Sequence, residues 1–290
     1  MATAIDDRYD ALIPADIAAK AELVGVRKAH LSAADTFVLG VVAGAFIALG
    51  AIFATTVTAG TADVPYGIAR LLGGLAFSLG LILVVVAGAE LFTGNNLIVM
   101  AWANRKIGTG LVLRNWVIVY LGNFVGSLAT AGIMLAAQQY LFGHGAVGLT
   151  ALTTADAKSG LDFLPAVALG VMCNALVCLA VWLSFGGRSV TDRILAIVFP
   201  ITAFVAAGFE HCVANMYFIP MGLLIKDQAP ASFWTEIGKS PADFPNLSWG
   251  NFLADNLLPV TIGNIIGGSV LVGAVYWFAY LRGRREGGAA

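Results

Sequence analysis

Six long apolar segments dominate this chain of 290 residues. A helix needs about 20 consecutive apolar residues to cross a lipid bilayer, and each segment reaches that length. The segments cover residues 36–59, 69–103, 111–142, 162–185, 190–226 and 252–281. Hydrophobic residues make up 59% of the chain and charged residues only 11%, whereas about a quarter of a soluble domain is charged. We therefore predict an all-α integral membrane protein with six transmembrane helices.

The second and fifth segments are longer than one crossing requires, yet too short for two. Each is about 35 residues long and carries glycine and polar residues near its middle. Backbone that is not helical occurs at membrane depth only where protein encloses it or where it lines a cavity. We therefore predict that transmembrane helices 2 and 5 are broken.

The two halves of the chain resemble each other. The stretches GAELFTGNN and GFEHCVANM share a glycine, a glutamate and an asparagine at the same spacing. Three pairs of segments match in the same order: 88–96 with 208–216, 122–127 with 263–269, and 40–44 with 170–174. Because each copy has three spans, the second copy must enter the bilayer from the side opposite to the first. The pattern therefore predicts two inverted repeats, over about 36–142 and 162–281, whose breaks meet near the midplane.

Lysine and arginine indicate how the chain lies in the membrane. With the amino terminus in the cytoplasm, twelve of the 16 lysines and arginines lie inside. The other four are Arg70, Lys158, Lys226 and Lys239. Positive residues are enriched in cytoplasmic loops, so we expect a multi-pass protein of the cell (inner) membrane with both termini in the cytoplasm.

The ends of the chain differ from its apolar middle. Residues 1–35 have mixed charge and no long apolar core, which excludes a cleaved signal peptide. Pro14 and the spacing of Ile17, Ala21 and Val24 predict a short amphipathic helix at the membrane surface. The predicted organisation is a cytoplasmic segment (1–35), a transmembrane domain (36–281) and a cytoplasmic tail (282–290).

Glu210 and His211 lie side by side in the fifth apolar segment. Charged groups at membrane depth are costly and face protein or water, not lipid. Glu90 matches Glu210 in the repeat, so both glutamates are expected to be scaffold, capping freed amides or pairing with a cation. Lys28 is one candidate partner of Glu210. His211 aligns with Leu91 and breaks the repeat, so we expect it to face the pathway, where an imidazole can exchange a proton near pH 6.5.

Other residues near the breaks are candidates for the pathway. Thr93 adds a hydroxyl that can bind an oxyanion, and Asn174 stands where the first half has Gly44. Apolar residues near the breaks either form constrictions or simply pack: Leu81, Leu91, Phe92, Val177 and Phe204. Asn123 and Asn264 are read as contacts between helices. Lys158 either draws anions inward or pairs with Asp156 on the surface.

Several classes of protein have little support. Charge is confined to loops and ends, which argues against nucleic-acid binding. The three cysteines lie in apolar segments and the histidines are not clustered, so we expect neither a metal site nor a cofactor. A haem protein or membrane enzyme would need a second histidine or a catalytic dyad in a span. We expect no enzyme activity.

Five motifs, in this order, resemble the formate–nitrite transporter family and most closely its formate-channel subtype. They are AGAELFTGN, TADAK, NALVCLAVW, GFEHCVANMYFIPMG and PVTIGNIIGG, and the similarity extends over nearly the whole chain. The resemblance implies a homopentamer whose six-helix protomers resemble aquaporins in outline and each contain a pore. Gly94 and Asn95 follow the threonine, where the formate-channel pattern has serine and threonine.

The resemblance also implies roles for individual residues. His211 matches the central pore histidine, and Thr93 matches the threonine that gates or binds substrate. The resemblance implies a periplasmic constriction of Leu91, Phe92 and Val177 and a cytoplasmic constriction of Leu81 and Phe204. Lys158 would attract anions, and Asn174 and Asn264 would be polar residues near the pore. Lys28 would form an ion pair with Glu210, and Glu90 and Asn215 would be supporting residues.

These features predict a channel or proton-coupled carrier for formate and similar small monovalent weak-acid anions. Protons, the lipid bilayer and four further copies of the chain are the expected partners. A nitrite or hydrosulfide channel of the same family is the alternative. A neutral-solute channel of the aquaporin type would carry paired Asn-Pro-Ala motifs at the breaks, and the sequence has none there.

Overall fold

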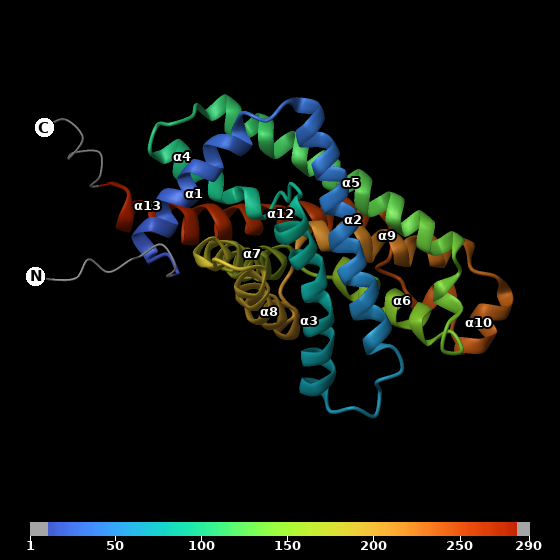
Figure 1. Cartoon of the computed structure of the whole chain (residues 1–290). Helices are drawn as coiled ribbons and strands as arrows, with labels where there is room; N and C mark the ends of the chain where they lie inside the picture. The colour runs from blue at the N-terminus through green and yellow to red at the C-terminus, as the bar shows by residue number, and fades with distance from the viewer. Residues whose placement is uncertain (1–10, 283–290) are drawn as a thin grey trace, which may run out of the picture.

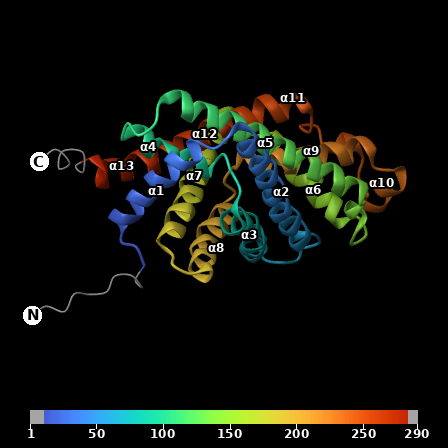
Figure 2. The ribbon, with the colours of Figure 1, turned by 45° about the horizontal axis from the view of Figure 1, so that its top comes forward.

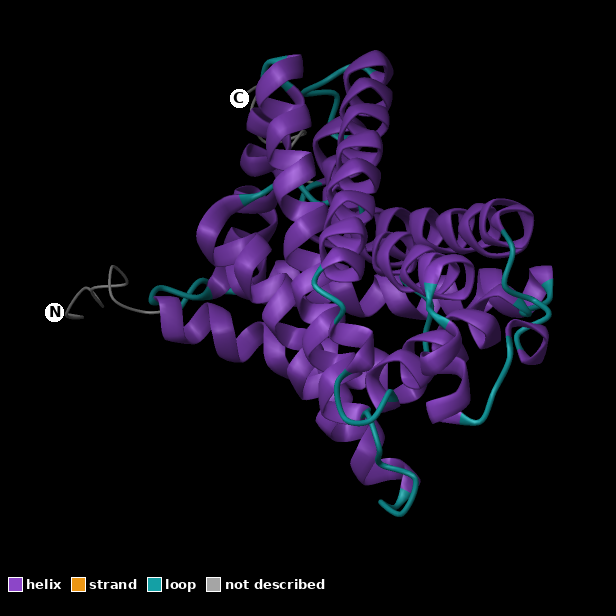
Figure 3. Ribbon diagram, turned by 90° about the vertical axis from the view of Figure 1, so that its right-hand side faces the viewer, coloured by secondary structure: helices purple, strands orange, loops and turns teal. Residues whose placement is uncertain are grey.

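The computed structural model describes residues 11–282, and all regular structure in this range is helical (Figure 1, Figure 3). Six helices are long and apolar enough to cross a membrane. They are α2 (Ala33–Thr58), α3 (Tyr66–Ile82) with its π-helical continuation η1 (Leu83–Gly88), α5 (Thr109–Ala136), α7 (Phe163–Gly186), α8 (Val190–Ala207), and a composite helix from Trp249 to Tyr280. The first ten residues and all but the first residue of the expected tail lie outside the described range.

Shorter elements complete the chain. The composite sixth helix consists of α11 (Trp249–Asn251), η5 (Phe252–Leu257), α12 (Leu258–Ile265), η6 (Ile266–Ala274) and α13 (Val275–Tyr280). The other short helices are α1 (Pro14–Ala29), η2 (Gly94–Ile98), α4 (Val99–Ala103), η3 (Gln139–Leu141), α6 (Ala146–Ser159), α9 (Cys212–Gln228), α10 (Ala231–Ile237) and η4 (Pro241–Asp243).

A glycine with positive φ ends the helical run before each of two irregular stretches. Gly88 has a φ of 89° and Gly208 a φ of 79°. Side chains with a Cβ rarely adopt this left-handed conformation, so glycine is the residue that ends a helix this way. Residues 89–93 and 209–211 then run without helical structure before η2 and α9 begin. The stretches shared by the two halves of the sequence therefore lie where the helices stop.

The helices form two similar groups. In one, α2 packs against α3 and α5; in the other, α7 packs against α8 and α12 (Figure 2). The groups join where α3 packs against α8. Glycines allow the closest approaches, because an added Cβ at Gly126 of α5 would meet the carbonyl oxygen of Val41 in α2.

The amino-terminal helix α1 lies against protein. Ile17, Ala18 and Ala21 are buried, and α1 contacts η2, α4 and α7. Lys20 donates a hydrogen bond to the carbonyl oxygen of Phe185, the penultimate residue of α7. The apolar face that predicted a helix at the membrane surface is thus buried against η2, α4 and α7.

The close contact between α2 and α5 generates a stability test. Gly126→Ala is expected to destabilise the protein by about 1–3 kcal/mol, because the new methyl group collides with backbone that cannot move aside. Gly132→Ala, in the same helix, is the control, because a Cβ there meets no atom within 4 Å. Denaturant unfolding of the detergent-purified variants measures the difference. Equal stability of the two variants would contradict this packing.

Candidate functional site

A cavity of about 480 Å³ lies beside the second irregular stretch. We call it the Lys158 cavity. Its lining includes side chains from α3, α6, α8 and the stretch 209–211: Phe77, Lys158, Phe204, Glu210 and His211. His211 and Glu210 are nevertheless almost fully buried, with 3% and 4% exposure. The sequence thus brings its two in-span ionisable neighbours to the wall of one cavity.

A second cavity of about 350 Å³ lies beside the first irregular stretch. We call it the Lys28 cavity, and its lining includes Lys28, Leu81, Glu90 and Leu91. Along α3, Phe77 lines the Lys158 cavity and Leu81 lines the Lys28 cavity. These two residues are four apart, which is about one helical turn. The two cavities therefore follow each other along α3, and about one turn of this helix separates the apolar residues that line them.

Thr93 and His211 join the two irregular stretches. Thr93 Oγ1 lies 2.9 Å from His211 Nε2, although the residues are 118 positions apart. On the other side of the ring, Nδ1 accepts a hydrogen bond of 3.0 Å from the backbone N–H of Ala214. A neutral imidazole carries one proton, so a ring that accepts at Nδ1 carries it on Nε2. The Nε2–H therefore donates to the Thr93 hydroxyl.

Aromatic side chains cover His211 on the Lys158 side. The Phe204 ring stacks on the imidazole with centroids 5.9 Å apart and an interplanar angle of 26°. Phe77 in turn contacts Phe204 edge to face at 5.7 Å. The polar edge of His211 thus points to Thr93 while an apolar wall lies beside its ring.

A polar cluster holds each irregular stretch, and the two clusters have the same design. In the first, Lys28 Nζ donates to Glu90 Oε1 at 2.8 Å, and Asn95 Nδ2 donates to Glu90 Oε2 at 2.7 Å. Asn115 accepts from Asn95 and donates to the carbonyl of Lys28. Every oxygen of the buried Glu90 carboxylate therefore has a donor, which is what a buried charge requires.

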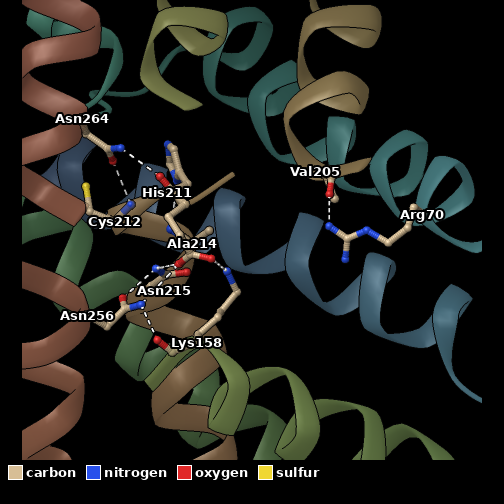
Figure 4. Close-up of polar contacts among 10 residues, drawn as sticks. Arg70, Lys158, Val205, His211, Cys212, Ala214, Asn215, Asn256 and Asn264 are labelled. Carbon is tan, nitrogen blue, oxygen red and sulfur yellow. Dashed lines mark hydrogen bonds and ion pairs between the residues drawn. The ribbon is translucent and has the colours of Figure 1, made fainter. Parts of the chain in front are cut away.

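The second cluster repeats these contacts (Figure 4). Lys158 Nζ donates to Glu210 Oε1 and Asn215 Nδ2 to Glu210 Oε2, both at 2.7 Å. Asn256 accepts from Asn215 and donates to the carbonyl of Lys158. Two contacts differ. Lys28 also donates to Asn95 Oδ1, whereas the buried Asn215 Oδ1 has no donor in the described part of the chain. Asn256 also donates to Glu210 Oε2, at 3.3 Å.

These clusters correct two expectations. The ion pair of Lys28 is with Glu90 and not with Glu210, and Lys158 pairs with Glu210 and not with Asp156. Asp156 instead accepts hydrogen bonds from Asn246. The reason is local: each lysine sits on the short helix, α1 or α6, that packs beside its own irregular stretch.

Two asparagines bind the freed backbone groups. Asn123 Oδ1 accepts from the N–H of Phe92, and Asn264 Oδ1 accepts from the N–H of Cys212, both at 2.9 Å. Their amide groups donate to the carbonyls of Glu90 and Glu210 respectively. The expectation that the two glutamates cap these amides is wrong, because their oxygens are occupied by lysine and asparagine donors.

Asn174 holds the backbone of Thr93. Its Nδ2 lies 3.2 Å from the Thr93 carbonyl oxygen, 2.9 Å from Asn96 Oδ1 and 2.7 Å from the Asn264 carbonyl oxygen. These contacts link α7 to the first irregular stretch, to η2 and to α12. Asn174 is fully buried and lines neither cavity.

Three of the five apolar residues expected at constrictions line a cavity. Leu91 lines the Lys28 cavity together with Leu81, and Phe204 lines the Lys158 cavity. Phe92 and Val177 are buried and line neither cavity. Phe92 packs on Tyr120 of α5, with ring centroids 4.9 Å apart. Leu81, Leu91 and Phe204 thus lie beside the cavities, and the two constrictions stay predictions.

Sequence reasoning missed three polar residues of the site. Asn115 and Asn256 complete the two clusters, and each lies eight residues before the asparagine of a Gly-Asn motif, at 123 and 264. That shared spacing was a usable signal within the repeat. Arg70 lines the Lys158 cavity, and its position near the start of α3 carried no such signal.

Comparisons with known proteins agree with this architecture. A family model described as formate/nitrite transporter matches residues 15–278. The chain is 49% identical to the formate channel FocA of Escherichia coli K12, covering 96% of this chain and 97% of that protein. It is 43% identical to the formate channel FocA of Haemophilus influenzae, covering 91% and 93%.

Two solved structures share the fold. A pentameric formate channel with formate bound has a TM-score of 0.82 and 49% identity, covering 86% of this chain and 98% of that one. An FNT family ion channel has a TM-score of 0.77 and 29% identity, covering 91% and 98%.

The pairing of the lysines generates a double-mutant cycle. Lys28→Met leaves the Glu90 carboxylate buried and unpaired, so we expect a loss of about 3 kcal/mol in the free energy of unfolding. Adding Glu90→Gln is expected to restore much of that loss, whereas adding Glu210→Gln lowers stability further. Denaturant titration of the parent protein, of the three single variants and of the two double variants measures both couplings. Coupling of Lys28 to Glu210 instead of Glu90 would contradict the observed ion pairs.

Proposed function

Because the chain belongs to the formate/nitrite transporter family, we propose that it is a membrane channel for formate and similar small monovalent weak-acid anions. Relatives named formate channels, at 49% and 43% identity, support this substrate. A nitrite or hydrosulfide channel on the same scaffold is the alternative. Such names describe transport, which favours a transport protein over an enzyme.

The observation that carries this proposal is the hydrogen bond between Thr93 and His211. His211 lines the Lys158 cavity and Gly94, the neighbour of the buried Thr93, lines the Lys28 cavity, so we take this contact as the junction of the two cavities. A polar contact with apolar residues on either side suits a small solute that must leave water briefly. The anion displaces this hydrogen bond and accepts from both the Thr93 hydroxyl and the His211 Nε2–H. The amino terminus of α9, which begins at Cys212, adds a favourable dipole.

Lys158 supplies donors on the way to this point. Its ammonium group has three hydrogens, and Glu210 Oε1 is its one hydrogen-bond acceptor in the part of the chain that the structure describes. The remaining hydrogens are available to an anion in the Lys158 cavity. Apolar walls at Phe204, Leu81 and Leu91 then favour a neutral species over an ion.

A proton linked to His211 fits the same geometry. An imidazolium has N–H groups at both nitrogens, so Nδ1 cannot accept from Ala214 in that state. When the imidazolium gives its Nε2 proton to formate, the neutral ring that results keeps its proton on Nδ1. This proton must move from Nδ1 before Nδ1 can again accept a hydrogen bond from Ala214. Passage of the neutral acid therefore alternates with loss and recovery of the helix cap on α9.

We infer that each protomer has two inverted repeats with broken helices 2 and 5, in an aquaporin-like arrangement, and that five protomers assemble. The matching clusters at Glu90 and Glu210 support the repeat. The pentameric formate channel at 49% identity supports the homopentamer. In this assembly each protomer carries its own pathway.

The proposed location is the inner membrane, with both termini in the cytoplasm. The distribution of lysine and arginine supports this orientation. The Lys28 cavity then opens toward the cytoplasm and the Lys158 cavity toward the periplasm. A neutral-solute channel is the competing function, and glycerol-driven swelling of proteoliposomes separates it from an anion pathway.

Replacement of His211 tests the proposed function in proteoliposomes. His211→Ala removes both the helix cap and the donor, and formate flux is expected to fall at least about tenfold, the equivalent of one lost hydrogen bond to a charged group. His211→Asn keeps a capping oxygen and an N–H donor but does not titrate. The parent protein is expected to show formate flux that rises as the pH falls, because the proposed step needs a protonated His211. His211→Asn is expected to conduct formate near neutral pH without this rise.

The outcomes separate two claims. No formate flux through the parent protein would overturn the channel assignment. A parent-like pH profile in His211→Asn would overturn the proton role while leaving the channel assignment intact.

A further inference from the structure

The two cavities differ in charge. Lys28 and Glu90 are the charged residues that line the Lys28 cavity, and they form an ion pair. Arg70, Lys158 and Glu210 are the charged residues that line the Lys158 cavity. Lys158 and Glu210 neutralise each other at 2.7 Å. Arg70 therefore leaves the lining of the Lys158 cavity with one net positive charge, whereas that of the Lys28 cavity is neutral.

Among the residues that the structure describes, Arg70 has only uncharged partners. Its Nε donates to the carbonyl oxygen of Ala206 at 3.1 Å, and Nη2 donates to the carbonyl oxygen of Val205. Figure 4 shows the guanidinium turned toward Val205, apart from the cluster around Lys158. The Tyr66 ring lies 6.0 Å from Cζ. Since carbonyls at a helix end carry only about half an elementary charge, the guanidinium stays a net cation.

The setting of Arg70 strengthens its field in the cavity. The side chain is half-buried, and its contacts fix it at the last turn of α8, just before the irregular stretch that carries His211. Apolar residues such as Phe77, Phe204 and Phe218 form much of the surrounding wall. Charge of one sign in a cleft with low-dielectric walls raises the local concentration of counter-ions.

Arg70 has no counterpart in the second half of the chain. The alignment of Gly88 with Gly208 pairs position 70 with Val190. The lysine and glutamate pairs occur in both halves, but this arginine does not. The difference in charge between the two cavities therefore comes from a residue outside the shared design.

We propose that Arg70 is the residue that concentrates small monovalent anions in the Lys158 cavity, ahead of Lys158 and His211. This assignment rests on the proposed anion-channel function. Lys158 donates hydrogen bonds at close range, but its charge is cancelled by Glu210. Arg70 supplies the net charge that acts across the cavity, and it makes the Lys158 side the better side for anion capture at low concentration.

Flux kinetics test this assignment. Arg70→Gln in proteoliposomes is expected to raise the half-saturating formate concentration about threefold at low ionic strength, with an unchanged maximal rate. The difference is expected to disappear near 1 M of an impermeant salt, where the Debye length is about 3 Å. Arg70→Lys is expected to stay close to the parent protein.

A charge-reversal series separates the charge of Arg70 from its contacts with α8. Arg70→Cys is labelled before reconstitution with a cationic or an anionic methanethiosulfonate of similar size. The cationic adduct is expected to restore the low half-saturating concentration, and the anionic adduct to raise it beyond that of Arg70→Gln. The parent protein treated with both reagents is the control, since its three cysteines are buried.

The outcomes are distinct. Equal effects of the two adducts, or parent-like kinetics of Arg70→Gln at low ionic strength, would overturn the assignment. Lys239→Gln removes a cation that lines neither cavity and is expected to change nothing. A parent protein without formate flux would overturn the proposed function and would be recognised before any variant is compared.

Discussion

The structure depends on hydrogen bonds to the backbone groups of two stretches that are not helical, in the interior of a membrane protein. The hydrocarbon core offers no water, so every freed N–H and C=O needs a partner from the protein. Asn123 and Asn264 each bind one N–H and one C=O of an irregular stretch, and His211 binds another N–H. Glycine at positions 88 and 208 ends the preceding helices, and the glutamates within these stretches bind lysine and asparagine. The two stretches are thereby held rigidly enough to meet.

The chemistry at the contact between Thr93 and His211 follows from these backbone hydrogen bonds. Because Nδ1 of His211 is used as an acceptor by Ala214, the neutral ring presents its donor to Thr93. A side chain that is needed for the local fold is thus also directed toward the junction of the two cavities. The proposed proton step uses this coupling, since a change in the charge of the ring changes the cap of α9. The Lys–Glu pairs neutralise their own charges, which leaves Arg70 to set the sign of the wider field on one side.

Much of this architecture could be predicted from residues. Apolar length predicted six membrane helices, and the described part of the chain has six helices of that kind. The motifs predicted the family. The repeated Gly-x-Glu element indicated where helical structure stops. Glycine can end a helix with a positive φ, and a carboxylate at membrane depth must be enclosed by protein.

Side-chain partners could not be predicted. Lys28 pairs with Glu90 and not with Glu210, because the pairing depends on how α1 packs, and α1 is remote in sequence from both glutamates. The cavity that Leu91 lines could not be predicted either, since an irregular stretch has no periodicity from which a facing direction follows. Arg70 belongs to no motif, and its meaning appears only when the charges around one cavity are compared.

The most direct measurement is an experimental structure of the protein in formate, at a resolution that separates the Thr93 hydroxyl from the His211 ring. The account predicts formate at the junction of the two cavities, within hydrogen-bond distance of Thr93 Oγ1 and His211 Nε2, with the hydrogen bond between these two groups opened. Formate bound elsewhere, with the Thr93–His211 hydrogen bond intact in every protomer, would contradict it.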